Sequence, residues 1–372
     1  MFVCVLRILH YFCNKNEDYN LFYNMQITNK LKKRYLFITI TILLIALCAI
    51  CGGVGYYFFL YPNFAPSKTS YIYIYPNDDF EYVCRQLEDS ANCTNIHAFA
   101  AVAKILKYPE NIKTGHYAIK SGTNNYDLLI SLRRGQQEPV RITFNNIRQK
   151  EDLTNRLSEQ LMITNQELNS LLDDESYCES FGFTPNTIKA MFIPNTYEVY
   201  WNISAEKLIE RMKREYDNFW TESRRNQAQN IRLTPLEVSI LASIIEEESA
   251  VTDEYPTIAG LYINRLHRGI PLQADPTVKY ALGDFAIQRI LNEHLKIDSP
   301  YNTYLYTGLP PGLLRIPSLK GRESVLNYQK HNYLYMCAKE DFSGRHNFAV
   351  TLAEHNRNAD RYRAELNRRG IR

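Results

Sequence analysis

One segment of the chain, from Tyr35 to Tyr61, is a long apolar run without a single charged residue. As a helix it would measure about 40 Å, more than the ~30 Å hydrocarbon core of a bilayer. Aromatic residues gather at both of its ends, as they do at membrane–water interfaces. The run therefore predicts a transmembrane helix over residues 35–61, and it places the flanking segments in different compartments.

The orientation of this helix is predicted by the charges beside it. The uncharged segment Pro62-Asn63-Phe64 follows the run. Four basic residues immediately precede the run: Lys30, Lys32, Lys33 and Arg34. The positive-inside rule then puts residues 1–34 in the cytoplasm and everything beyond the span outside it. A cleaved signal peptide is the alternative, but the run is long for one and lacks a convincing cleavage site. We expect a retained single-pass anchor in the lipid bilayer. Met1 and Met25 are both candidate start residues, and a start at Met25 would leave residues 1–24 untranslated.

Composition excludes several classes of protein. The chain has 43 Lys and Arg against 40 Asp and Glu, a net charge of +3 that argues against nucleic acid as a partner. It is 45% hydrophobic with only 15 Gly and 15 Pro, which excludes disordered and fibrous chains. Cys84 and Cys93 are close enough in sequence to bridge in an oxidising compartment, and whether they do is left open.

Residues 62–146 are expected to form a small α+β unit. The alternation from Tyr71 to Tyr75 predicts a strand, and two further short strands are expected at 115–119 and 140–144. Helical spacing is found between these strands, at residues 80–87, 96–106 and 125–132. Residues 147–372 should then form a larger mixed α+β domain, so that the fold class is α+β with one membrane helix.

A well-marked helix begins at Thr234. Thr234 can cap it, Pro235 suits its first position, and Glu237 completes a capping box. Projected at 100° intervals, one face is apolar and carries Val238, Leu241, Ile244 and Ile245. Ser243, Glu246 and Glu247 project to the opposite side.

Glu248 projects into the apolar stripe of this helix. Desolvation and the helix C-terminus both favour a neutral carboxylic acid there, which is the form that a general acid requires. The alternative is that the helix ends at Glu248 and leaves its carboxylate on a solvated rim. Periodicity by itself favours that second interpretation.

Amide, hydroxyl and tyrosine side chains are dense between residues 260 and 312. The candidates for substrate binding are Asn264, Gln273, Asp275, Thr277, Tyr301, Asn302 and Tyr304. Such groups suit a carbohydrate groove, in which hydroxyls need hydrogen-bond partners and sugar rings need aromatic platforms. They also serve as turn formers, and composition does not separate the two interpretations.

Four ordered motifs resemble those of the endolytic murein transglycosylases, the YceG-like or MltG-like family. They are ASIIEEES at 242–249, NRLHRGIPLQADPTVKY at 264–280, YNTYLYTGLPPG at 301–312 and HNFAVTLAEHN at 346–356. The anchor and the segment from Phe192 to Tyr200 also lie where such proteins have them. The chain departs from the family at Asn195, commonly acidic, and at residues 315–318, commonly ending in Asn-Pro-Gly.

The resemblance implies a fold, an activity and a catalytic residue. Residues 62–146 would be a LysM-like subdomain and residues 147–372 a YceG-like catalytic domain. The enzyme would be a lyase that cleaves the β-1,4 bond between MurNAc and GlcNAc in nascent peptidoglycan strands and leaves 1,6-anhydro-MurNAc ends. The family's catalytic glutamate corresponds to Glu248, and Glu246 matches an acidic family position that would bind or orient substrate.

The resemblance also implies a location and partners. The catalytic domain would lie outside the bacterial cytoplasmic membrane, next to peptidoglycan synthases and the elongation or division machinery. No cofactor and no metal are expected.

Two other functions compete with this interpretation. A non-catalytic, membrane-tethered peptidoglycan-binding or division-scaffold protein would give no reason for a glutamate on an apolar face. A metallohydrolase would have to use His331, His346 and His355, whose spacing matches no helical zinc motif. The histidines at 346 and 355 are instead expected to stabilise the C-terminal fold.

Overall fold

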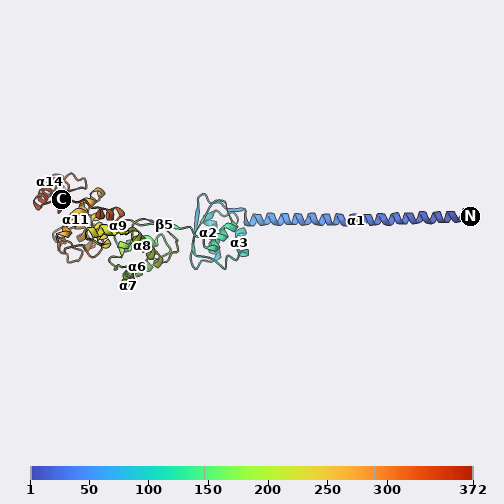
Figure 1. The fold of residues 1–372 in the computed structure, drawn as a ribbon, viewed down its shortest axis with the longest axis horizontal. Helices are drawn as coiled ribbons and strands as arrows, with labels where there is room; N and C mark the ends of the chain where they lie inside the picture. Colours follow the sequence, from blue (N-terminus) through green and yellow to red (C-terminus); the bar gives the residue numbers. More distant parts are fainter. Residues whose placement is uncertain (1, 146, 288–289, 371–372) are drawn as a thin grey trace. The chain divides into compact units, whose positions relative to one another are not determined.

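The computed structural model describes residues 2–145, 147–287 and 290–370, and the chain divides into two compact units. The first unit is Met1–Gln137 and the second is Glu138–Arg372. Figure 1 shows their helices and strands in sequence colours. Each unit is described separately below.

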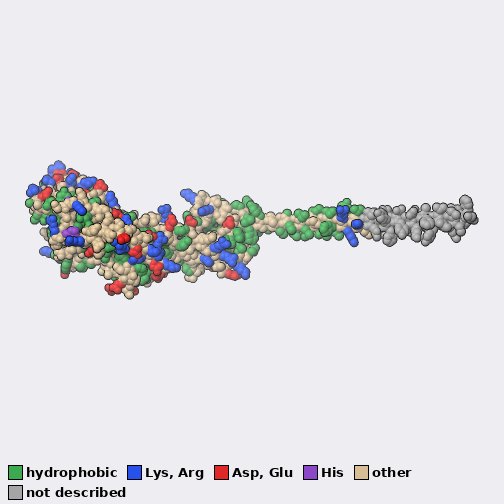
Figure 2. Space-filling model, viewed as in Figure 1, with side chains coloured by type: hydrophobic (Ala, Val, Ile, Leu, Met, Phe, Trp, Pro, Cys, Tyr) green, Lys and Arg blue, Asp and Glu red, His purple; other side chains and the backbone are tan. Residues whose placement is uncertain are grey.

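The first helix, α1, spans Phe2–Phe59, and its part from Asn29 to Phe59 is long and apolar enough to cross a membrane. Its apolar side chains are exposed, and Figure 2 shows them covering the described part of the helix, with Lys and Arg side chains toward its N-terminal end. The helix ends at Phe59 rather than at the predicted Tyr61. Its end is fixed to the smaller unit, because Asn125 Nδ2 donates to the Phe58 carbonyl at 2.8 Å and Phe58 packs against that unit's core.

The smaller unit contains the strands and helices predicted between residues 70 and 134. Strands β2 (Ser70–Ile74) and β3 (Gly115–Ile119) pair antiparallel in the register Ile72↔Tyr117. The other elements are β1 (Pro62–Phe64), α2 (Phe80–Ala91), α3 (Ile96–Ile105), β4 (Thr123–Asn124) and α4 (Asn125–Arg134). Because side chains alternate along β2, Ile72 and Ile74 both point into the apolar core, where they pack with Phe99. Cys84 and Cys93 are both free thiols.

The strand expected at residues 140–144 belongs to the other unit. It forms β5 (Val140–Thr143) and pairs antiparallel with β6 (Thr196–Val199), in the register Ile142↔Tyr197. The sequence pattern identified the strand correctly but assigned it to the wrong unit, because a four-residue strand carries no information about its partner. Asn146, where the sequence placed the boundary, lies outside the described residues.

The larger unit is mainly helical. Its remaining elements are α5 (Lys150–Ser158), α6 (Asn165–Asp173), α7 (Glu175–Ser180), η1 (Ile188–Met191), α8 (Ala205–Phe219), α9 (Glu222–Asn230), α10 (Pro235–Glu248), η2 (Thr252–Glu254), α11 (Tyr255–His267), α12 (Asp275–Leu282), η3 (His294–Lys296), α13 (Leu319–Leu326), β7 (Tyr335–Ala338), β8 (His346–Ala349) and α14 (Leu352–Arg368). One contiguous apolar core runs through most of these elements, and its members come from outside η2, η3 and α14. Helix α10 lies within it and contacts α11, α12 and α13.

Helix α10 begins as the sequence predicts but is buried more completely. Thr234 Oγ1 accepts from the Glu237 amide, and the Glu237 carboxylate accepts from the Thr234 amide. All residues from Val238 to Ile245 are buried, so the expected polar face opposite the apolar stripe is wrong. Helix α13 and the chain at 313–318 cover that face; Ser243 Oγ accepts there from the Leu314 amide at 3.1 Å.

Candidate functional site

A cleft of about 880 Å³ opens at the C-terminal end of α10. Residues from α10, α12, β7 and α14 line it, together with the chain before α5 and the loop after α12. Acidic, basic and aromatic side chains all reach it: Glu247, Glu248, Asp275, Arg148, Lys279, Arg363, Tyr280, Phe285 and Tyr362. Helix α10 supplies two consecutive glutamates to its wall.

Glu248 is the last residue of α10, and its carboxyl group is desolvated. The residue lines the cleft, yet Oε2 is inaccessible to solvent and, among the described residues, has no hydrogen-bond partner. Burial, helped by the negative charge of Asp275, raises the pKa of Glu248 to about 8. The carboxyl group is therefore mainly protonated at neutral pH, and the alternative of a solvated rim carboxylate is wrong.

Three groups oppose that protonation and keep the pKa from rising further. The Tyr262 hydroxyl donates a hydrogen bond to the Glu248 carboxyl, which lowers its pKa. The positive charges of Lys279 and Arg265 lower the same pKa. Asp275, which raises it, accepts a hydrogen bond from the Tyr304 hydroxyl at 2.6 Å. The elements packed around Glu248, which are α11, α12 and the loop that carries Tyr304, thus set its pKa to about 8.

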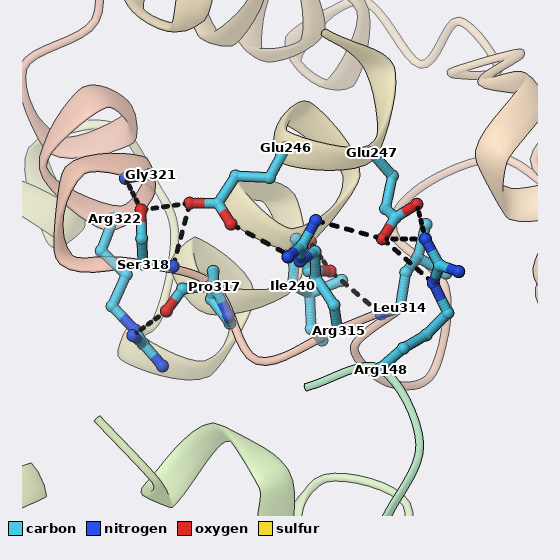
Figure 3. Close-up of polar contacts among 11 residues, drawn as sticks. Arg148, Ile240, Glu246, Glu247, Leu314, Arg315, Pro317, Ser318, Gly321 and Arg322 are labelled. Carbon is cyan, nitrogen blue, oxygen red and sulfur yellow. Dashed lines mark hydrogen bonds and ion pairs between the residues drawn. The ribbon is translucent and has the colours of Figure 1, made fainter. Parts of the chain in front are cut away.

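Glu247 points to a different set of partners. Arg148 binds its carboxylate in a bidentate manner, with Nη2–Oε2 at 2.7 Å and Nη2–Oε1 at 2.9 Å. Arg315 Nη1 lies 3.4 Å from the same oxygen, Oε1. Figure 3 shows Glu247 held between these two guanidinium groups. The guanidinium of Arg148 also lies over the ring of Phe285, 4.5 Å from its centroid, so this pair forms part of the cleft wall.

Glu246 does not line the cleft. Its Oε1 accepts hydrogen bonds from the backbone amide and the hydroxyl of Ser318, the residue that caps α13, as Figure 3 shows. Gly321 leaves room for it, since a Cβ there would stand 2.3 Å from Oε1. The charge of Glu246 also acts on the fully buried Arg322 of α13, and we therefore assign Glu246 to α10–α13 packing instead of substrate binding.

The structure separates the other predicted polar residues into two groups. Asp275 lines the cleft, and Tyr304 donates a hydrogen bond to Asp275. The rest mainly bond to backbone or to neighbouring side chains: Asn264 to the carbonyls of His331 and Tyr333, Gln273 to Arg265, Thr277 to Thr303, Tyr301 to Tyr280, and Asn302 to the carbonyls of Leu295 and Ile297. Their contacts shape the loops behind the cleft, which favours the interpretation of these residues as turn and loop formers.

The three histidines occupy separate environments. His346 Nδ1 lies 2.9 Å from Glu254 Oε2, His331 Nε2 lies 2.9 Å from the Thr257 carbonyl, and His355 stacks near Tyr335. Within the described ranges, no three His, Cys, Asp or Glu residues gather as potential metal ligands. His346 ties β8 to η2, directly after the turn that follows Glu248, which agrees with the structural role expected for it.

Several cleft residues were not identified from the sequence. Lys279 follows Asp275 by one helical turn, so spacing alone could have found it. Arg148 pairs with a glutamate 99 residues away, and Cys337 and Arg363 come from β7 and α14; no local pattern signals such contacts.

Comparison with known proteins identifies the family. The profile of the YceG-like family matches residues 72–361, which include α10, most of the residues that line the cleft and the smaller unit from residue 72 onward. The chain belongs to the YceG-like family. Within it, an endolytic murein transglycosylase of Bacillus subtilis strain 168 is 28% identical, over 75% of this chain and 88% of that protein.

Two further YceG-like relatives extend the comparison. An endolytic murein transglycosylase of Streptococcus pneumoniae strain R6 is 29% identical over 72% of this chain, which spans about half of that protein's length (54%). The crystal structure of a yceG-like protein from Listeria monocytogenes matches 78% of this chain and 98% of its own with a TM-score of 0.51 at 24% identity. That likeness supports a shared fold.

Proposed function

We propose that this YceG-like protein is an endolytic peptidoglycan lytic transglycosylase, with Glu248 as its single catalytic acid and base. The observation that carries the proposal is the desolvated carboxyl of Glu248 at the wall of a polar cleft. The relatives named endolytic murein transglycosylase support the substrate class, peptidoglycan.

Glu248 would act twice in one turnover. In its protonated form it donates its proton to the glycosidic oxygen as the bond from C1 of MurNAc to that oxygen breaks. The resulting carboxylate then accepts the proton of the muramoyl C6 hydroxyl while its oxygen forms the new bond to C1. The products are a 1,6-anhydro-MurNAc end and a free GlcNAc hydroxyl; no water is consumed and Glu248 is protonated again.

One carboxyl group is sufficient for this sequence. Glu247 is held by two arginines and Asp275 by Tyr304, so neither competes with Glu248 as the acid. The acetamido group of the substrate would stabilise the positive charge at C1, in place of the second carboxylate of ordinary glycosidases.

Helix α1 would hold the enzyme in the bacterial cytoplasmic membrane, with residues 1–34 inside and both folded units outside. The apolar exposed surface of residues 35–59 and the basic residues before it support this orientation. The order β2-α2-α3-β3 with an antiparallel strand pair supports a LysM-like smaller unit.

Digestion of purified glycan strands tests the proposal. Full-length protein in detergent is compared with Glu248→Gln and, as a matched control, with Glu222→Gln, an exposed glutamate of α9. Mass spectrometry should find anhydro-muramoyl ends with wild type and Glu222→Gln only.

Each other result points to a different conclusion. Equal activity of Glu248→Gln would overturn the catalytic assignment, and reducing ends would indicate a hydrolase. Strand binding without cleavage by wild type would favour the non-catalytic scaffold.

A further inference from the structure

Among the described residues, three cationic side chains line the cleft, and two of them are already engaged. Arg148 is bound by Glu247, and Arg363 pairs with Asp360 one turn earlier on α14. Lys279 differs: among the residues that the structure describes, no carboxylate lies within ion-pair distance of its Nζ and no hydrogen bond uses it. Within the described part of the cleft wall, the ammonium group of Lys279 is therefore not neutralised by an ion pair.

The position of Lys279 relates it to the reaction centre. It lies one turn after Asp275 on α12, half-buried, on the face of that helix that lines the cleft. Asp275 would be its natural i,i+4 partner but is hydrogen-bonded to Tyr304 instead. Lys279 is close enough to Glu248 for its charge to act on that carboxyl.

Resting on the proposed function, we propose that Lys279 binds a carboxylate of the peptidoglycan strand beside the scissile bond. The sugars themselves carry no charge, so the anion must come from the lactyl substituent of MurNAc. With a stem peptide attached, it is a stem carboxylate; with the stem removed by an amidase, it is the lactyl carboxylate itself.

Binding of this anion would also assist the reaction. The charge of Lys279 favours ionised Glu248, and a bound carboxylate would cancel that effect. Glu248 would then hold its proton more firmly once the strand is in place. The carboxylate thus contributes both to affinity and to the acid form of Glu248.

The test compares three glycan substrates of equal strand length. The first has intact stems, the second has stems whose carboxylates were converted to amides, and the third is denuded by an amidase. Wild type is compared with Lys279→Met, Lys279→Arg and the control Lys207→Met, an exposed lysine of α8. The measured quantity is the ratio of kcat/KM values between substrates, because changes common to all substrates cancel in it.

For wild type, Lys207→Met and Lys279→Arg we expect a preference of about tenfold for a carboxylate-bearing strand over the amidated one, and for Lys279→Met a ratio close to one. A preference for intact stems identifies the stem carboxylate; one for denuded strands only identifies the lactyl group. Equal cleavage of all three substrates by wild type, or an unchanged ratio in Lys279→Met, would overturn the proposal. Absence of anhydro ends from every substrate would instead overturn the proposed function.

Discussion

The glutamates in the last turn of α10 lie in contrasting environments. On the side facing α13, Glu246 accepts two hydrogen bonds from Ser318. Glu247, at the cleft wall, is held by Arg148 and Arg315. On the side facing the cleft, Glu248 has an oxygen that is buried without a partner among the described residues. The three residues are consecutive, so the difference arises from their surroundings alone.

This contrast shows how burial can serve either stability or chemistry. A buried carboxylate that receives donors and cations remains charged and fixes the elements that supply them. A carboxyl such as Glu248, whose desolvation outweighs its hydrogen bond from Tyr262 and the nearby cations, retains its proton instead. Glu246 and Glu247 fix the end of α10, and Glu248 is free to exchange a proton there.

The largest expected effect is on the pH dependence of cleavage. Because the general acid must be protonated and the pKa of Glu248 is about 8, activity should fall as pH rises through that value. Beyond it, kcat/KM should decrease about tenfold per pH unit. Measurement of rates from pH 5 to pH 10 checks this, and a rate still rising at pH 9 would contradict it.

A control identifies the titrating group. Burial lowers the pKa of Lys189 to about 8 as well, and its Nζ donates to the carbonyls of Arg148 and Leu313. The alkaline decrease should persist in Lys189→Met if it belongs to Glu248.

The next largest effect concerns the α13 side. Replacing Glu246 by Gln removes the negative charge near buried Arg322 and weakens the contact with Ser318, which should lower the free energy of unfolding by about 2–3 kcal/mol. Urea denaturation measures this change. Glu222→Gln, on the exposed face of α9, should change it by less than about 0.5 kcal/mol. Similar values for both variants would mean that Glu246 does not hold α13.

Glu248→Gln should have the opposite effect on stability, and this effect should grow as pH rises above about 4.5. The native pKa is raised above its usual value of 4.5, so native Glu248 stabilises the fold less and less as pH rises from about 4.5 to about 8. The variant has no charge to bury and should melt several degrees above wild type at pH 9, at about 2–4 °C per kcal/mol. At pH 4 the melting temperatures should coincide; a constant difference would argue against a raised pKa.

The smallest effect is expected at the other end of α10. Thr234→Ala removes the hydroxyl that caps the Glu237 amide and should destabilise the fold by about 1 kcal/mol. Because the cap lies at the far end of the helix from Glu248, cleavage per folded molecule should be unchanged. A loss of activity exceeding the loss of folded protein would show that the two ends of α10 are coupled.

The sequence predicted those features that depend on neighbouring residues. The apolar run, the alternation of β2 and the capping box at Thr234 are local, and all three are present. The projection also directed attention to Glu248, whose carboxyl is desolvated in the structure, although it assumed a polar opposite face that α13 covers. The small residues Ser239 and Ser243, one turn apart, are the signal that another helix packs there.

The other features depend on distant contacts that local patterns do not contain. Strand β5 joins β6 across more than fifty residues, and Arg148 reaches Glu247 from before α5. Most of the amides and hydroxyls proposed for substrate bind backbone carbonyls or other loop side chains instead, as Asn302 does. Residue type indicates that a polar group needs a partner, but not whether the partner is substrate or protein.

The central claim, that Glu248 is a neutral acid in the resting protein, can be observed directly. Infrared difference spectroscopy of wild type against Glu248→Gln, titrated from pH 4 to pH 10, reports the carbonyl stretch of one protonated carboxyl group. The band should be present at pH 7, absent from the variant, and lost with a midpoint near pH 8. A carboxyl that ionises near pH 4.5, leaving no such band at pH 7, would contradict the claim.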